Sequence, residues 1–338
     1  MQIAVDAMGG DFAPRAVVEG ACQAAEDGIA VLLVGDPERI EQELERLGRP
    51  SGVAIEAASQ VVGMDERAMA VRQKRDASIR VCARLVREGT AQAVVTAGNT
   101  GAAMIAAKTV VGAIPGVDRP ALAAIYPGPT GQTVILDVGA NVSAKPSHLR
   151  QFAVMGHFYA QSTLGIDEPR VGLMSVGEEE SKGTELSRQA FKVLQETGLN
   201  FVGNVEGRDV FSGTADVIVC DGFVGNVMLK SNEALAGFLG SMLKEELVRS
   251  WRTQIGAWIA KPAFLGLRRR TDWNETGAVP LLGVRGGFFI GHGRSGPKAI
   301  RNAIRRAVEF CRDDLHTKIQ EKVAELHAQE ERYHIDDT

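Results

Sequence analysis

One local pattern recurs along the chain and constrains its fold more than any other feature. A short run of β-branched residues leads into a turn rich in glycine and asparagine, and an amphipathic helix follows. Turns of this kind lie at residues 6–11, 97–101, 137–141, 175–177, 220–225 and 291–296. Strands that alternate with helices predict a mainly parallel sheet covered by helices on both faces. We therefore expect a three-layer α/β/α fold, formed by a single domain that spans residues 1–338.

The glycines of the chain gather in these turns. There are 38 glycines among 338 residues, without the three-residue period of collagen, and a hydrophobic content of 45% excludes a disordered chain. In parallel sheets, ligands bind beyond the carboxyl ends of the strands, where these turns are predicted. The N-termini of the helices behind the turns favour anions. The pattern therefore predicts a site for an anion such as phosphate.

The turn at residues 291–296 matches the GxGxxG pattern of a dinucleotide site. Such a site needs a second strand about 20 residues later, but here a helical pattern continues. A phosphate cradle fits better, with backbone N–H groups around Gly293 and with Ser295 near the helix start. His292 is a candidate for catalysis or phosphate contact, because imidazole can donate, accept and titrate near neutral pH. A plain tight turn is the alternative.

Other predicted strand ends carry further polar candidates. Asp137, Asn141 and Asn226 are catalytic candidates, because a carboxylate can orient a neighbouring group and an amide can stabilise an oxyanion. The candidates for binding phosphate or substrate are two cations and two turn residues, Lys145, Lys182, Gly98 and Asn99. Helix capping and turn formation are the alternatives for these residues.

Several common catalytic motifs are absent from the sequence. There is no GxxxxGK[ST] loop, no GxSxG turn, no HExxH helix and no CxxC pair. We therefore expect no cofactor, no metal and no covalent nucleophile. Four separated cysteines and the lack of a leader-like start favour a cytoplasmic protein with reduced thiols.

A helical excursion from the sheet is predicted at about residues 231–275. Between residues 244 and 270 the chain has seven basic and two acidic residues, although its net charge is −4. This segment is a candidate for contact with a membrane or with an acidic carrier protein, or for packing on its own subunit or a second copy. The residues expected at this contact are Trp251, Trp258, Ile259, Lys261, Arg268 and Arg269. One long structural helix is expected at about residues 297–331.

Seven stretches of the chain carry a family resemblance, at residues 3–14, 96–102, 137–149, 177–183, 203–209, 221–226 and 280–293. Read in this order, they resemble the motifs of the bacterial phosphate acyltransferases of phospholipid synthesis. The resemblance implies a Rossmann-like fold similar to phosphotransacetylase and to the isocitrate and isopropylmalate dehydrogenases. It also implies a homodimer that contacts the membrane peripherally.

The activity implied by this resemblance is transfer of a long-chain acyl group from acyl carrier protein to inorganic phosphate. The acyl phosphate product would then feed phosphatidic acid synthesis through a glycerol-3-phosphate acyltransferase. Nucleic acid is not an expected partner. Two alternatives are an NAD-dependent decarboxylating dehydrogenase and a non-catalytic membrane scaffold for lipid enzymes.

Overall fold

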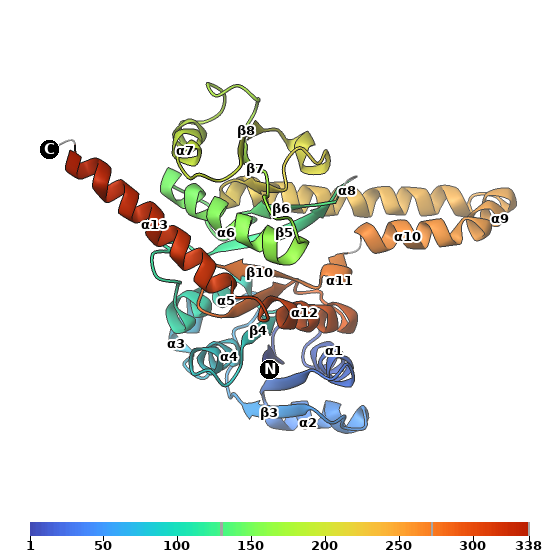
Figure 1. Cartoon of the computed structure of the whole chain (residues 1–338). Helices are drawn as coiled ribbons and strands as arrows, with labels where there is room; N and C mark the ends of the chain where they lie inside the picture. The colour runs from blue at the N-terminus through green and yellow to red at the C-terminus, as the bar shows by residue number, and fades with distance from the viewer. Residues whose placement is uncertain (129–130, 272, 337–338) are drawn as a thin grey trace.

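The computed structural model describes residues 1–128, 131–271 and 273–336, with the side chains of 267–274 and 329–336 left out. Within these residues, eleven strands form one sheet (Figure 1). The strands are β1 (Gln2–Asp6), β2 (Ala30–Gly35), β3 (Val53–Ala57), β4 (Ala93–Thr96), β5 (Ala121–Pro127), β6 (Gln132–Leu136), β7 (Val171–Met174), β8 (Phe201–Val205), β9 (Val217–Val219), β10 (Ala278–Leu282) and β11 (Gly287–Gly291). Their order across the sheet is β3-β2-β1-β4-β11-β10-β5-β6-β9-β7-β8.

The sheet consists of two parallel halves that run in opposite directions. Strands β3, β2, β1, β4 and β11 are parallel to one another, as are β6, β9, β7 and β8. Between the halves, β10 pairs antiparallel with β11 and with β5, and β5 pairs antiparallel with β6. Three successive antiparallel pairings therefore reverse the strand direction from one half to the other.

Helices cover both faces of the sheet, as the alternation of strands and helices predicts. The helical elements of the body are α1 (Arg15–Glu26), α2 (Pro37–Arg46), α3 (Ala70–Gln73), α4 (Ser78–Arg87), α5 (Thr100–Ala106), η1 (Ala107–Val111), α6 (Pro146–Leu164), α7 (Glu185–Gln195), η2 (Gly207–Phe211), α12 (Pro297–Phe310) and α13 (Leu315–Asp336). Ile3 and Val5 pack in a core with α1, α2, α6, α7, α12 and α13. Ala4, which points to the other face, packs in a core with α4, α5 and η1.

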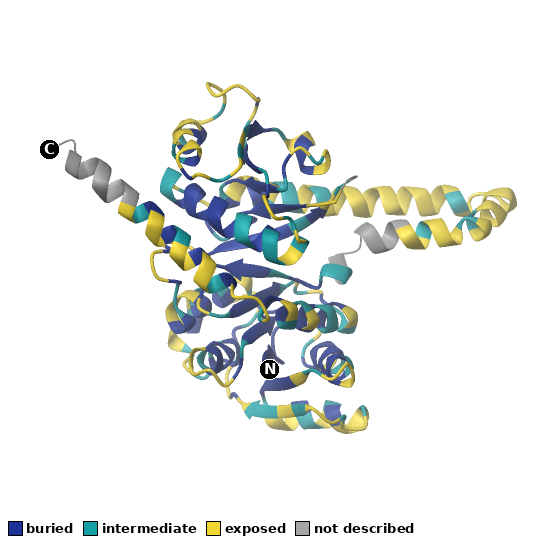
Figure 2. Cartoon of the chain, in the orientation of Figure 1, coloured by how far each residue is buried: buried dark blue, intermediate teal, exposed yellow. Residues whose placement is uncertain are grey.

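Three helices form the excursion from the sheet. These are α8 (Gly222–Val248), α9 (Trp251–Ile259) and α10 (Lys261–Thr271), and the short α11 (Trp273–Thr276) leads back to β10. Only the first turns of α8 pack on the sheet, where Gly222 and Gly225 are buried. The remainder projects from the body as an exposed arm (Figures 1 and 2). No helix in the described part of the chain is both long enough and apolar enough to cross a bilayer.

The C-terminal segment differs from the prediction of one helix over residues 297–331. It forms two helices, α12 and α13, separated at residues 311–314. The break turns α13 toward α6, against which it buries an apolar stripe. The stripe comprises Leu315, Ile319, Val323 and Leu326. A straight continuation of α12 would leave these side chains in solvent, and the hydroxyl of Ser162 also bonds the Asp313 carboxylate beside the break.

Candidate active site

The predicted site residues lie at two opposite edges of the sheet. The first edge holds the turns at the carboxyl ends of β1, β4 and β11, with Gly98, Asn99, His292, Gly293 and Ser295. The second edge holds the turns at the carboxyl ends of β6, β7 and β9, because this half of the sheet runs the other way. Strands of four or five residues separate the two edges by roughly 13–17 Å. One phosphate therefore does not contact both edges.

The residues of the second edge are Asp137, Asn141, Lys145, Lys182 and Asn226. Sequence patterns do not distinguish the residues of the first edge from those of the second, because each residue follows a predicted strand. The direction of each strand, which only the pairing reveals, decides the edge on which its residue lies.

The three turns of the first edge pack directly on one another. The Thr96 hydroxyl donates to Asp6 Oδ2 at 2.8 Å, and the Asp11 N–H donates to the Gly293 carbonyl at 2.8 Å. A β-carbon placed on Gly9 would lie 2.9 Å from the Gly98 nitrogen, so this contact needs glycine. Burial raises the pKa of Asp6, and its hydrogen bonds with Thr96 and Met8 oppose that shift. Asp6 therefore joins the turn after β1 to β4.

Asn99 has a structural role in this arrangement. Its side-chain oxygen accepts from the Ala102 N–H at 3.0 Å and caps α5. Its side-chain nitrogen is within hydrogen-bond distance of the carbonyls of Gly63, Met64 and Glu66, at 2.9–3.3 Å. The amide therefore holds the 63–66 loop against the first edge.

The start of α12 combines an exposed histidine with a buried serine. His292 Nδ1 accepts a hydrogen bond from the Arg294 N–H at 3.2 Å, and Ser295 donates its N–H to the His292 carbonyl. The Ser295 side chain is only 2% exposed, and its hydroxyl has no hydrogen-bond partner in the described part of the chain. No side chain caps α12, which begins with Pro297 after Gly296. The N–H groups of its first turn therefore face the same turn as Ser295.

Asp137 and Asn141 brace the turn that follows β6. Asp137 is fully buried and accepts from four backbone N–H groups and from the Asn141 side chain. Burial raises the pKa of Asp137, against the effect of these donors. The Asn141 side chain donates to Asp137 at 2.9 Å and to the Pro120 carbonyl at 2.8 Å, which uses both of its N–H bonds. In this arrangement Asn141 has no donor left for an oxyanion.

The start of α8 packs on this braced turn. The Gly222 N–H donates to the Asn141 carbonyl at 2.8 Å. A β-carbon on Gly225 would lie only 1.9 Å from the Asp137 carbonyl oxygen. Asn226, one residue later, lies against Gly139. Asn226 is therefore near Asp137 and Asn141, as expected for one group of residues, but far from His292.

Lys145 belongs to a cationic cluster that sequence reasoning missed. The Lys145 N–H donates to His148 Nδ1 at 3.1 Å at the start of α6. The pKa of His148 is lowered by burial and by the positive charges of Arg119, Lys145 and Lys108, and the charge of Asp118 opposes this shift. Lys108 and Arg119 stand alone in the sequence, next to no motif, and only the fold brings them toward Lys145.

Lys182 lies apart in the loop that follows β7. It is exposed, and its N–H donates to the Glu179 carbonyl. The Asn204 side chain donates to that same carbonyl at 2.9 Å and so holds the loop on β8. The Ser175 hydroxyl, at the end of β7, is buried and has no hydrogen-bond partner in the residues described.

The arm presents the residues expected to contact a membrane or a carrier protein. Trp251, Trp258 and Ile259 are 67%, 75% and 68% exposed, and Lys261 is also exposed. The side chains of Arg268 and Arg269 lie outside the described residues. The apolar side chains therefore point to solvent and are not packed on this chain's own sheet.

Comparison with known proteins identifies the family. Residues 1–318 match the family model described as "Fatty acid synthesis protein". A phosphate acyltransferase of Pelotomaculum thermopropionicum is 51% identical over 328 residues, which cover 96% of each chain. The chain belongs to the phosphate acyltransferase family. A phosphate acyltransferase of Heliobacterium modesticaldum is 52% identical over 96% of this chain and 98% of that relative. The chain is therefore an enzyme of the acyltransferase class, from a family of fatty acid synthesis.

Solved structures confirm the fold. A phosphotransacetylase of Streptococcus pyogenes matches with a TM-score of 0.62 at 17% identity, over 91% of this chain and 94% of that one. A 4-hydroxythreonine-4-phosphate dehydrogenase of Klebsiella pneumoniae matches with a TM-score of 0.56 at 15% identity, over 92% and 99%. The phosphate acyltransferase family thus shares its α/β architecture with transacylases and with a dehydrogenase.

Proposed function

We propose that this acyltransferase moves a long-chain acyl group from acyl carrier protein to inorganic phosphate, and that the acyl phosphate serves phospholipid synthesis. The observation that supports a phosphate site most directly is the buried Ser295 hydroxyl, which lacks a partner at the start of α12. Leaving a buried hydroxyl unbonded costs about 1–3 kcal/mol. A phosphate oxygen at this turn would satisfy it.

The electrostatics at the start of α12 favour an anion. Uncapped N–H groups at the N-terminus of a 14-residue helix carry a partial positive charge toward the turn. Gly293, in the same turn, allows a ligand to approach the backbone closely. The proposed phosphate therefore accepts hydrogen bonds from the first turn of α12 and from Ser295.

The proposed reaction needs positioning more than acid–base assistance. A phosphate oxygen attacks the thioester carbonyl, a carbon–oxygen bond forms, and the carbon–sulfur bond then breaks. The leaving thiolate takes up a proton to give the free thiol of the carrier. Because a simple thiol has a pKa of about 8.5, the thiolate is a good leaving group. Holding phosphate and carbonyl in line supplies much of the acceleration.

His292 is proposed as a hydrogen-bond donor in this reaction. Its Nδ1 accepts from the Arg294 N–H, so the neutral ring carries its proton on Nε2. That Nε2–H can donate to the phosphate or to the developing oxyanion. The same tautomer does not act as a base at Nε2, which narrows the roles open to His292.

We propose that the residues of the second edge either fix the turn after β6 or attract anionic substrates. Asp137 and Asn141 fix the turn on which α8 begins, and Asn226 lies on the same turn. Lys145, near Lys108 and Arg119, would draw anionic substrates toward the sheet. Lys182, in the loop after β7 with Glu178, Glu179 and Glu180, is proposed to contact an anionic substrate at the same edge.

The arm is proposed to place a cytoplasmic enzyme on a membrane and beside a second copy. Its tip combines exposed tryptophan and isoleucine with cations, the composition of interfacial helices. Phe238, Leu239 and Met242 on α8 are about half exposed, and such a surface is typical of homodimer contacts. A membrane position would pass acyl phosphate to a downstream glycerol-3-phosphate acyltransferase.

Replacing Ser295 with alanine tests the phosphate site. Hydrogen bonds to charged groups contribute about 1.5–3 kcal/mol, so the KM for phosphate should rise about ten-fold or more. Ser175→Ala is a matched control, because it removes an equally unpartnered buried hydroxyl at the second edge. The assay is acyl phosphate formation from palmitoyl-acyl carrier protein at varied phosphate, and His292→Ala should lower kcat/KM in it.

The reverse result would contradict this assignment. If Ser175→Ala raises the KM for phosphate and Ser295→Ala does not, phosphate binds at the second edge. If the wild type forms no acyl phosphate from acyl carrier protein, the proposed reaction itself is wrong.

A further inference from the structure

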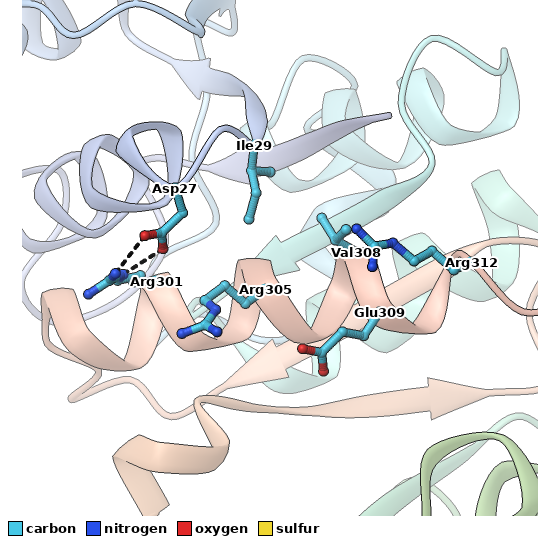
Figure 3. Close-up of a pocket in the computed structure, with 7 residues that line it drawn as sticks. All are labelled: Asp27, Ile29, Arg301, Arg305, Val308, Glu309 and Arg312. Carbon is cyan, nitrogen blue, oxygen red and sulfur yellow. Dashed lines mark hydrogen bonds and ion pairs between the residues drawn. The ribbon is translucent and has the colours of Figure 1, made fainter. Parts of the chain in front are cut away.

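A pocket lies on the outer face of α12, and none of its lining residues belongs to the proposed phosphate site. Its volume is about 520 Å³, and it lies between α12 and the turn from α1 to β2. Figure 3 shows Arg301 and Arg305 on α12 and Arg312 just beyond its end, with Val308 on the helix and Ile29 on the facing turn before β2. The remaining lining residues are Asp27 and Glu309.

The three arginines differ in their contacts with carboxylates of the described residues. Arg301 is held by Asp27 through two hydrogen bonds of 2.7 and 2.8 Å. Arg305 and Arg312 form no salt bridge within the residues whose side chains the structure describes. Glu309 lies between them on the helix and is also free of any salt bridge to a described residue. The pKa of Asp27 is lowered by its hydrogen bonds with Arg301 and by the charges of Arg301 and Arg305, so Arg305 also interacts with this carboxylate beyond salt-bridge distance. The pocket therefore presents two guanidinium groups that form no salt bridge to a described side chain, beside the carboxylates of Asp27 and Glu309.

The position of this pocket links it to the reaction centre. Arg301 and Arg305 occupy the face of α12 opposite its buried stripe of Ala299, Ile300, Ala303, Ile304 and Ala307, and Arg312 follows two residues after the end of the helix. At 1.5 Å per residue, Arg301 lies about 8 Å and Arg305 about 14 Å along the helix from Gly296. A partner that docks here would have its prosthetic arm close to the turn with His292 and Ser295.

We propose that this pocket is the docking surface for the acidic acyl carrier protein, an inference that rests on the proposed function. The whole chain has a net charge of −4, so an acidic partner needs a local positive surface to approach it. Arg305 and Arg312 supply that surface, since a guanidinium binds carboxylates through paired hydrogen bonds. Ile29 and Val308 add a small apolar floor.

A membrane fits this surface less well. Interfacial membrane binding needs exposed large apolar residues. Ile29 and Val308 are partly buried and pack against the core, whereas the tip of the arm exposes Trp258 and Ile259. The two basic surfaces of the enzyme thus have different partners, with the carrier protein on α12 and lipid at the arm.

Charge reversal in the pocket tests the docking surface. In the variant R305E/R312E, kcat/KM for palmitoyl-acyl carrier protein should fall about ten-fold or more, through slower association. Palmitoyl-pantetheine, which lacks the carrier protein, should react as it does with the wild type. R87E is the matched control, because Arg87 is exposed on α4, and α4 covers the opposite face of the sheet from α12.

A second variant, E309Q, is expected to raise kcat/KM, and its test does not require the fold to tolerate two charge reversals. E309Q removes the carboxylate between the two arginines, so kcat/KM for palmitoyl-acyl carrier protein should rise about two- to five-fold at low salt. The gain should disappear at high salt. A destabilised protein would not bind its carrier better.

Several results would overturn the proposal. It fails if R305E/R312E leaves kcat/KM for the carrier-bound substrate unchanged, or lowers it equally for palmitoyl-pantetheine. It also fails if E309Q reduces use of the carrier. If the wild type makes no acyl phosphate from palmitoyl-acyl carrier protein, the proposed function is wrong as well. If the wild type is active and R305E/R312E is equally active, only the docking surface is wrong.

Discussion

Replacing Gly225 with alanine tests whether α8 has to begin directly on the turn that follows β6. A β-carbon at this position would lie 1.9 Å from the Asp137 carbonyl oxygen. Carbon and carbonyl oxygen approach to about 3.3 Å, so the helix or the turn has to move by roughly 1.4 Å. The obstacle is backbone, held by the Asp137 N–H bond to Cys220 and the Cys220 N–H bond to Leu136. It cannot rotate away as a side chain would.

The expected loss of stability follows from this geometry. Overpacking a well-packed site costs about 1–3 kcal/mol, and a contact this short with backbone belongs at the upper end. Alanine has a helix propensity up to about 1 kcal/mol better than glycine, which offsets part of the cost. We therefore expect Gly225→Ala to reduce the free energy of unfolding by about 2–3 kcal/mol. Gly256→Ala on α9, where the new β-carbon meets nothing within 4 Å, should raise it slightly or leave it unchanged.

Urea unfolding of both variants, together with acyl transfer activity, measures this difference. Gly225→Ala should also lose activity, because Asp137 and the start of α8 move together. Equal unfolding midpoints for Gly225→Ala and Gly256→Ala, with full activity in both, would refute the claim that this contact locks the second edge.

Two further predictions concern pH and the arm. Burial lowers the pKa of His316, whose Nε2 accepts a hydrogen bond from the Gly286 N–H. As pH falls through about 6.5 the unfolded chain therefore binds a proton before the folded chain does, and the folded state loses stability. Between pH 7.5 and 5.5 the urea midpoint should drop less in His316→Gln than in the wild type, and an identical drop would contradict this prediction. Trp258→Glu with Ile259→Glu should weaken binding to anionic vesicles about 100-fold, because two exposed apolar side chains no longer enter the interface. Val202→Glu, an exposed apolar residue of the body, is the control in the vesicle assay, and unchanged binding of the double variant would argue against membrane contact at the tip.

Local sequence patterns predicted the six strands that lead into the glycine-rich turns and the helices behind these turns, but they did not single out β3, β5, β8 or β10. They could not predict the reversal of strand direction, because β5 and β10 look like any other apolar strand. Ala121 pairs with Leu282 from more than 150 positions away, and nothing near either residue encodes that pairing. The residues that the sequence analysis assigned to one phosphate site consequently lie at two different edges of the sheet.

The roles of individual side chains were also decided by long-range contacts. Asn99 and Asn141 occupy turns where an amide suits either catalysis or capping. In the structure the Asn99 amide bonds backbone carbonyls and the Ala102 N–H, and the Asn141 amide donates to the Pro120 carbonyl and to the Asp137 carboxylate. Lys108 and Arg119 lie outside every motif and join Lys145 only through the fold. The break before α13 had a local signal, since Asp313 and Asp314 are typical of a new helix start.

The single helix α12 fixes the geometry between two functions. Its first turn faces the proposed phosphate, and its outer side lines the arginine pocket. Because an α-helix is stiff, the separation and angle between the two are set by residue count and not by loop conformation. Adding one residue between Pro297 and Arg301 would advance the pocket by about 1.5 Å and rotate it by about 100° around the helix axis. The helix thus fixes both the distance and the direction between the pocket and the proposed phosphate site, and a carrier protein docked on it would deliver its thioester with a constant geometry.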